Sequence, residues 1–280
     1  GGPLMARFTT SDGLRLHFTD EGAGDPILCL AGLTRNATDF KFVLPFLAQH
    51  RVIRMDYRGR GLSDYANDFM TYSIPQEAAD ALALMDHLGL ERATILGTSR
   101  GGLIAMVLAA TVPERLSGAI LNDIGPEISP EGMERIMDYL GTRPRFADYD
   151  AAAKGLSAAY ATQFPGVPDT RWRVQAEMMW AEADDGLDLR YDPRLRNAML
   201  AQRDAGPAPD LWPLFDALAA RPLTVIRGAN SDLLTTETLA KMHARAPNMR
   251  SATVPNRGHV PFLDEAEALA AIHAHLRDFA

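Results

Sequence analysis

The chain has 280 residues, of which 47% are hydrophobic and 23% charged, and its formal net charge at pH 7 is −8. This length and hydrophobic content are typical of one large α/β domain or of a core with an insertion. The acidic balance, with no run of Lys and Arg, argues against nucleic acid and against a membrane surface as partners, and it does not indicate an oligomeric state.

The single cysteine and the hydropathy pattern bear on the compartment. Cys29 lies in an apolar run, so we expect a buried, inert thiol and no disulfide. The sequence contains no apolar run of about 18 residues that could span a membrane. We therefore expect a soluble, cytoplasmic protein.

Apolar segments alternate with helical patterns along most of the chain. An Asp-Gly turn at 12–13 separates two alternating segments and predicts a hairpin, with His17 on its outer face. Further strands are predicted at 26–30, 51–55, 93–98, 117–123, 222–228 and 251–254, and helices at 38–47, 74–88, 100 onward, 236–244 and 264–279. Strands that alternate with helices in this way predict an α/β fold with a mostly parallel central sheet flanked by helices.

One long segment breaks this alternation. From 127 to 209 there is no pattern of a buried strand, and helices are predicted at 130–140, 148–164, 170–183 and 193–203. We interpret 127–209 as an inserted helical cap, between a first part of the core at 1–126 and a second part at 210–280. Trp180 in this insertion is a candidate substrate contact, and Phe164, Trp172, Met178 and Met179 could also face a substrate. Packing onto the core explains most of them equally well.

The segment Gly97-Thr98-Ser99-Arg100-Gly101 stands at a predicted turn from strand to helix. This Gly-x-Ser-x-Gly spacing is typical of a nucleophile elbow, in which a positive φ holds the Ser hydroxyl away from the backbone. The alternative is the glycine-rich turn of a phosphate or dinucleotide site. It is disfavoured because the segment has neither Gly-x-Gly-x-x-Gly nor Gly-Lys-Ser/Thr. We therefore expect Ser99 to be a nucleophile.

A serine hydroxyl needs a base and an orienting acid. His259 follows the last predicted strand in a glycine-flanked loop, and ligand sites of parallel sheets gather at this edge. Other histidines, such as His275, have polar neighbours in helices and are expected to be solvated. Asp232, after the strand at 222–228, is the favoured acid because the order Ser, Asp, His places it nearer to His259. Asp123, at the end of the preceding strand, is the rival.

An oxyanion site requires two convergent backbone N–H groups. One is expected from Arg100, directly after the nucleophile, and the other from Leu33, which follows Gly32. Arg35 and Asn36 lie just beyond this loop and are candidate substrate contacts, as is Val260 beside His259. The Arg100 guanidinium is expected to line the rear of the site and to pair with Asp123 or with an acidic group of the substrate.

Together these segments resemble the α/β-hydrolase family. They occur in the family's order, and the resemblance covers nearly the whole chain. The matching segments are Leu30-Ala31-Gly32-Leu33, the Asp-Tyr-Arg-Gly-Arg-Gly-Leu-Ser-Asp run at 56–64, Gly97 to Gly102, Gly228 to Asp232, and Gly258-His259. The resemblance implies a serine hydrolase for small carboxylic esters or lactones, with Ser99, Asp232 and His259 as its triad and a helical cap over the site. It implies no cofactor and no metal. The 56–64 run is interpreted as a structural loop that braces the site.

Two alternatives remain open from the sequence. Carbon–carbon bond hydrolases of ring-cleavage products use the same fold and triad, but they tend to carry Trp where this chain has Val260. A slow-turnover receptor for a small molecule could also use a lidded pocket.

Overall fold

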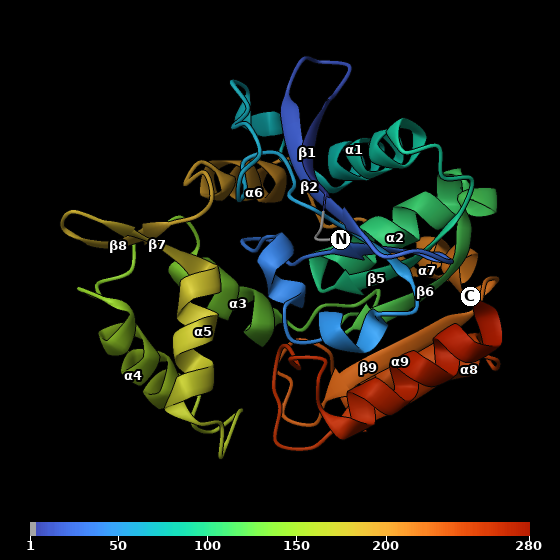
Figure 1. Ribbon diagram of the computed structural model, residues 1–280. Helices are drawn as coiled ribbons and strands as arrows, with labels where there is room; N and C mark the ends of the chain where they lie inside the picture. Colours follow the sequence, from blue (N-terminus) through green and yellow to red (C-terminus); the bar gives the residue numbers. More distant parts are fainter. Residues whose placement is uncertain (1–3) are drawn as a thin grey trace.

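A computed structural model describes residues 4–280, and its centre is one sheet flanked by helices (Figure 1). Within this range the sheet has eight strands, in the order β1-β2-β4-β3-β5-β6-β9-β10. They are β1 Leu4–Thr9, β2 Arg15–Glu21, β3 Pro26–Leu30, β4 Arg51–Met55, β5 Ala93–Thr98, β6 Leu116–Asn122, β9 Leu223–Gly228 and β10 Arg250–Val254.

The pairing of these strands confirms the predicted fold class. β1 pairs with β2 and β2 with β4 in antiparallel fashion, and every pair from β4 to β10 is parallel. Strands β5 and β9 are buried at every position because helices cover both faces of the sheet. The carboxyl ends of β3, β5, β6 and β9 therefore meet at one edge.

Helices pack on both faces of the sheet, each through its apolar residues. They are α1 Ile74–His87, α2 Arg100–Thr111, α7 Trp212–Ala219, α8 Thr236–Arg245, α9 Ala266–Phe279, and the short 3₁₀ helices η1 Ala37–Phe40, η2 Leu44–Leu47, η3 Phe69–Thr71 and η4 Pro113–Arg115. Helices α1, α2, α7 and α8 share one hydrophobic cluster with the sheet, and η1, η2 and α9 share another. The helix predicted over 38–47 is thus two short 3₁₀ helices.

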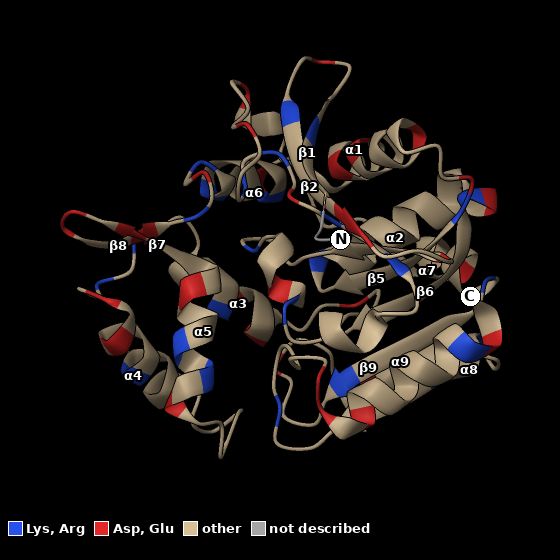
Figure 2. Ribbon diagram, in the orientation of Figure 1, with Lys and Arg blue, Asp and Glu red and all other residues tan. Residues whose placement is uncertain are grey.

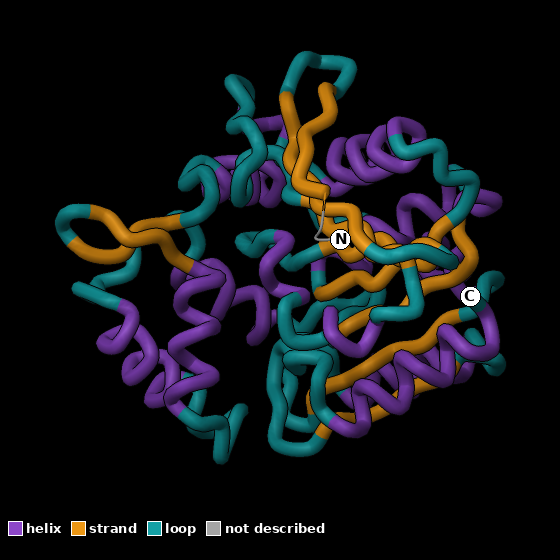
Figure 3. Tube along the Cα trace, in the orientation of Figure 1, coloured by secondary structure: helices purple, strands orange, loops and turns teal. Residues whose placement is uncertain are grey.

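The chain between β6 and β9 leaves the sheet. It forms α3 Pro130–Tyr139, α4 Tyr149–Ala159, α5 Asp169–Met179, β7 Trp180–Ala183, β8 Gly186–Leu189 and α6 Leu195–Asp204. Figure 1 shows α3, α4 and α5 beside the core, with the β7–β8 hairpin above α4 and α5 in this view, and Figure 3 shows that hairpin as a separate strand pair. The helix predicted over 170–183 ends at Met179, because the Asp184-Asp185 turn closes a hairpin whose Ala183 pairs with Gly186.

An aromatic cluster joins this segment to the core. Trp172 of α5 and Phe164 each pack against Phe262, which follows the last strand, with ring centroids 5.9 and 5.7 Å apart.

Cys29 is fully buried, and burial raises the pKa of its thiol to about 12. Among residues 4–280 no helix is both long and apolar enough to cross a bilayer. Lys and Arg are interspersed with Asp and Glu along the chain (Figure 2).

Candidate active site

Ser99 lies between β5 and α2 with φ 50° and ψ −112°, the strained geometry that its sequence spacing predicts. The flanking glycines are required by close contact. A Cβ on Gly97 would lie 2.6 Å from the Gly101 carbonyl carbon, and one on Gly101 would lie 2.2 Å from the Leu30 carbonyl oxygen. Larger residues at these positions would therefore separate the strand from the helix.

The structure brings Ser99, His259 and Asp123 together from three separate loops. The Ser99 Oγ is 3.0 Å from the His259 Nε2, and the His259 Nδ1 is 2.6 Å from the Asp123 Oδ2. Asp123 is fully buried. Its carboxylate also accepts hydrogen bonds from the Gly228 N–H at 2.8 Å and from the Ser231 hydroxyl at 2.6 Å. These donors fix the carboxylate in the orientation that holds the imidazole.

The sequence-based preference for Asp232 as the partner of His259 is wrong. The Asp232 carboxylate accepts from the Gln163 Nε2 at 3.0 Å and pairs with the Arg135 Nε at 2.9 Å. Chain order could not separate the two candidates, because both acids lie between the serine and the histidine. Sheet order does separate them: β6 neighbours β5, and Asp123 directly follows β6 with φ 58°.

Two backbone N–H groups beside Ser99 are free to bind an oxyanion. The Leu33 N–H donates to no other group within residues 4–280. Arg100 is the first residue of α2, so no preceding helical carbonyl accepts from its N–H. A Cβ on Gly32 would lie 3.9 Å from the Ser99 Cβ, which places the Leu33 loop against the nucleophile. Both predicted donors therefore lie next to Ser99, and their binding of an oxyanion stays a prediction.

The loop at 56–64 holds the backbone of the Leu33 loop. The Tyr57 hydroxyl donates to the Ala31 carbonyl at 2.7 Å, and the Arg60 Nε donates to the Leu33 carbonyl at 2.8 Å. Asp56 accepts from the Ala37 N–H at 2.7 Å and lies 2.9 Å from the His17 Nδ1. His17 is therefore buried in this network and does not lie on an outer face as predicted.

The predicted position of the Arg100 side chain is also wrong. Its Nε donates to the Glu77 Oε1 at 2.5 Å and its Nη2 to the Oε2 at 3.1 Å, away from Asp123. Glu77 also accepts from the Arg60 Nη1 at 2.9 Å. All three side chains are buried. Burial alone would raise the pKa of Glu77, but the two guanidiniums outweigh it and hold that pKa below its ordinary value.

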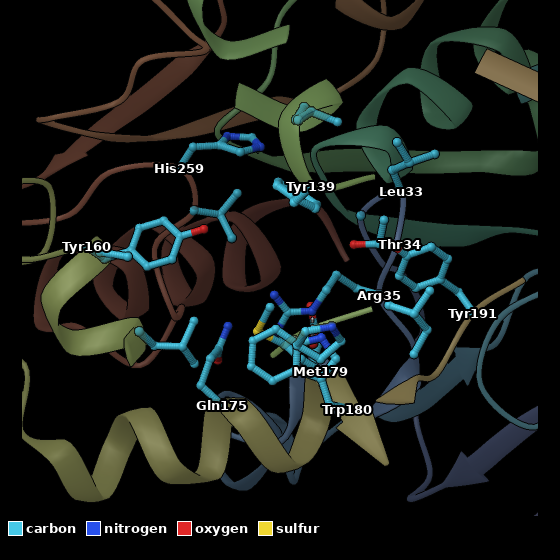
Figure 4. A pocket seen from close by; sticks show the side chains of 18 of the residues that line it. Leu33, Thr34, Arg35, Tyr139, Tyr160, Gln175, Met179, Trp180, Tyr191 and His259 are labelled. Carbon is cyan, nitrogen blue, oxygen red and sulfur yellow. Dashed lines mark hydrogen bonds and ion pairs between the residues drawn. The ribbon is translucent and has the colours of Figure 1, made fainter. Parts of the chain in front are cut away.

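A pocket of about 410 Å³ opens at Ser99 and His259 (Figure 4). Leu33, Arg35, Trp180 and Val260 line it, and substrate contact by the last three stays a prediction. Asn36 does not line this pocket. Its side chain accepts from the Thr38 N–H at the start of η1 and donates to the Met178 carbonyl at 2.9 Å, so it is a structural link to α5.

Further pocket residues come from the segment between β6 and β9 and are mostly aromatic or apolar: Tyr139, Phe146, Leu156, Tyr160, Phe164, Trp172, Met179, Leu189 and Tyr191. The sequence indicates only Phe164, Trp172 and Met179 among them as residues that could face a substrate, with packing as the equally good explanation. Gln175 of α5 and Arg143 are polar exceptions. A helical pattern identifies apolar faces but not which of them meets a cavity. Within the described part of the chain, no group of three or more His, Cys, Asp or Glu side chains is arranged to hold a metal.

Comparison with known proteins gives the same fold. Residues 25–266 match the alpha/beta hydrolase fold family. The chain belongs to this family. The hydrolase is 37% identical over 266 residues to a 3-hydroxybutyrate-oligomer hydrolase of Cupriavidus necator, covering 89% of each chain. It is 27% identical to a 2-(acetamidomethylene)succinate hydrolase of Mesorhizobium japonicum, over 88% of this chain and 85% of the relative.

A solved structure agrees with the whole course of the chain. The crystal structure of an alpha/beta hydrolase from Novosphingobium aromaticivorans is 44% identical, with a TM-score of 0.92 and coverage of 98% of both chains. Membership of this family makes the protein a hydrolase that acts on small molecules.

Proposed function

We propose that the hydrolase cleaves small carboxylic esters or lactones through an acyl-enzyme on Ser99. The observation that carries this proposal is the continuous hydrogen-bonded chain from the Ser99 Oγ through His259 to the buried Asp123, at 3.0 and 2.6 Å. The relative at 37% identity is named for hydrolysis of 3-hydroxybutyrate oligomers, whose units are joined by ester bonds. Ester chemistry therefore agrees with both the geometry and this relative.

The reaction follows from the geometry in two halves. The Ser99 Oγ attacks the ester carbonyl while the His259 Nε2 takes its proton, and Asp123 stabilises the resulting imidazolium. The N–H groups of Leu33 and Arg100 bind the negative oxygen of the tetrahedral intermediate. His259 then gives the proton to the leaving alcohol. In the second half the His259 Nε2 takes a proton from water, whose oxygen attacks the acyl carbonyl. The bond between that carbon and the Ser99 Oγ then breaks, His259 returns the proton to the Oγ, and the acid is released.

We also propose that residues 127–209 act as a cap that sets the substrate range. Most of the pocket wall opposite Ser99 comes from this segment, including Tyr160, Met179 and Trp180. An aromatic wall excludes water and contacts apolar parts of a substrate, while the sheet edge supplies the reacting groups. Carbon–carbon bond hydrolysis of ring-cleavage products uses the same triad and is the second candidate, with no pocket residue that favours it.

A panel of substrates tests the proposal. Short- and long-chain esters, lactones and a dienone-type diketone are incubated with the wild type and with Ser99→Ala. We expect many turnovers of at least one ester or lactone by the wild type, and a loss of at least about 10³-fold in kcat for Ser99→Ala. Turnover of the diketone alone would favour the carbon–carbon reaction. A single burst without turnover would favour a receptor.

A further inference from the structure

Two arginines, Arg35 and Arg143, line the pocket beside Ser99, and no part of the proposed mechanism uses either of them. Arg35 follows the Leu33 loop, and its side chain is only 18% exposed. A Cβ on Gly32 would lie 3.7 Å from the Arg35 Cγ and 3.9 Å from the Ser99 Cβ. The stem of the arginine and the nucleophile therefore lie on two sides of the same point in the pocket wall.

One edge of the Arg35 guanidinium is fixed by the protein. Its Nε donates to the Asp39 Oδ1 at 3.0 Å, and its Nη2 lies 2.8 Å from the same oxygen. The Asp39 side chain is 11% exposed, so solvent screens this pair weakly. A carboxylate on this edge offsets the cost of burying the cation and sets the plane of the fork.

The other edge of the fork faces a neutral group. With its amide oxygen turned toward Arg35, Gln175 accepts hydrogen bonds from Nη2 at 2.7 Å and Nη1 at 3.1 Å. Figure 4 shows the Arg35 and Gln175 side chains pointing toward each other inside the pocket. A guanidinium edge of this kind fits both oxygens of a carboxylate, with stronger bonds than those to an amide. Gln175 therefore occupies the place that an anionic ligand group would take.

The other pocket cation does not offer such an edge. Arg143 pairs with Asp185 and Asp188, and its side chain is 39% exposed. Near Arg35 the pocket adds the Tyr160 hydroxyl, whose pKa burial raises, so that it remains a protonated donor. Arg35 is thus the cation that is both held in place and turned toward the interior.

We propose that Arg35 binds a free carboxylate of the substrate, through its Nη1 and Nη2 and with displacement of the Gln175 amide. The substrate class is then an ester that carries a carboxylate a few bonds from the scissile carbonyl, as in an acylated short hydroxy acid. This inference rests on the proposed ester hydrolysis and adds the group by which the enzyme selects among esters.

Two substrates that differ only in this group provide the test. 3-Acetoxybutanoate and 3-acetoxybutanamide share the scissile ester, and only the first carries a carboxylate. We expect the wild type to favour the carboxylate in kcat/KM by about 10- to 100-fold, the range of a charge-assisted bidentate bond. The double variant Arg35→Met/Asp39→Asn, which leaves no unpaired carboxylate, should bring the ratio close to one. Arg35→Lys should retain part of the preference.

The matched control removes an arginine–aspartate pair outside the pocket. Arg171 donates to both oxygens of Asp264 at 3.0 and 2.7 Å, and Arg171→Met/Asp264→Asn should keep the wild-type ratio. The inference is overturned if Arg35→Met/Asp39→Asn keeps that ratio, or if Arg143→Met removes it instead. A wild type that hydrolyses both substrates equally, with dependence on Ser99, overturns this inference alone. A wild type that hydrolyses no ester overturns the proposed function with it.

Discussion

Substitution of Asp123 by asparagine tests the structural assignment of the orienting acid against the sequence-based one. The Asp123 Oδ1 accepts from a backbone N–H, that of Gly228, while the Oδ2 accepts from the Ser231 hydroxyl and the His259 Nδ1. Since the backbone donor cannot rotate, the amide oxygen of an asparagine will face Gly228 and its NH₂ will face the imidazole. His259 must then accept at Nδ1 and carry its proton on Nε2.

The wrong tautomer cannot take the proton of Ser99. In Ser–His–Asp sites, changing the acid to its amide lowers kcat by about 10⁴-fold, and we expect Asp123→Asn to show a loss of that order. Any donor left without an acceptor in this buried site costs about 1–3 kcal/mol of unfolding free energy. The variant should therefore remain folded while losing almost all activity.

The assay is kcat on the best ester of the panel, with circular dichroism and thermal unfolding to check the fold. Asp232→Asn is the matched control, because Asp232 interacts with Arg135 and Gln163 and not with the imidazole. This partly exposed pair contributes about 0–1 kcal/mol to the unfolding free energy, so Asp232→Asn should stay folded. Since Asp232 does not contact the imidazole, kcat should stay near the wild-type value. If Asp232→Asn loses activity as Asp123→Asn does, or if Asp123→Asn keeps it, the structural assignment fails.

Two further predictions concern buried ionisable groups away from the triad. Glu77→Gln leaves the guanidiniums of Arg60 and Arg100 buried without their anion. It should lower the unfolding free energy, measured by urea denaturation, by about 3–5 kcal/mol. The double variant Glu77→Gln/Arg100→Met should recover part of this loss, and a double variant as unstable as Glu77→Gln would contradict the reasoning. Burial, reinforced by Arg250, lowers the pKa of His275 to about 4. The folded protein then binds fewer protons than the unfolded chain between roughly pH 6.5 and 4, so stability falls by up to about 3 kcal/mol as the pH drops through this window. His275→Gln should lose less unfolding free energy over this pH window than the wild type, as measured by urea denaturation at each pH. Equal losses for the two proteins would refute this prediction.

Much of the fold could be predicted from local patterns. Short, mostly apolar runs such as 26–30 and 93–98 are typical of strands covered on both faces, and their alternation with helices indicates a parallel sheet. The β7–β8 hairpin was missed because its strands are short and half-exposed, so helical composition masked the Asp-Gly turn signal at 185–186. His275 is expected in solvent from its helix and its polar neighbours in sequence, yet it is fully buried and its Nδ1 lies 2.9 Å from the Thr224 hydroxyl of β9.

The candidate site divides in the same way. Ser99 and His259 have local signals, a constrained turn and a glycine-flanked loop after a strand. The choice between Asp123 and Asp232 depends instead on which strand lies next to β5, and a one-dimensional pattern does not contain this information. The pocket walls have still less signal, because an aromatic residue that packs and one that faces a cavity occupy the same kind of helical position.

Arg100 shows why a residue beside the nucleophile could not be interpreted alone. A charged side chain next to Ser99 suggests a substrate contact, but its partner Glu77 lies on α1, 23 residues earlier. The same carboxylate neutralises Arg60, whose Nε holds the Leu33 carbonyl. One buried anion therefore connects the residues that carry both proposed oxyanion donors, Leu33 and Arg100. Glu77 itself does not line the pocket. A substitution there is nevertheless expected to shift the Leu33 and Arg100 N–H groups, and so to weaken their hydrogen bonds to the substrate oxygen.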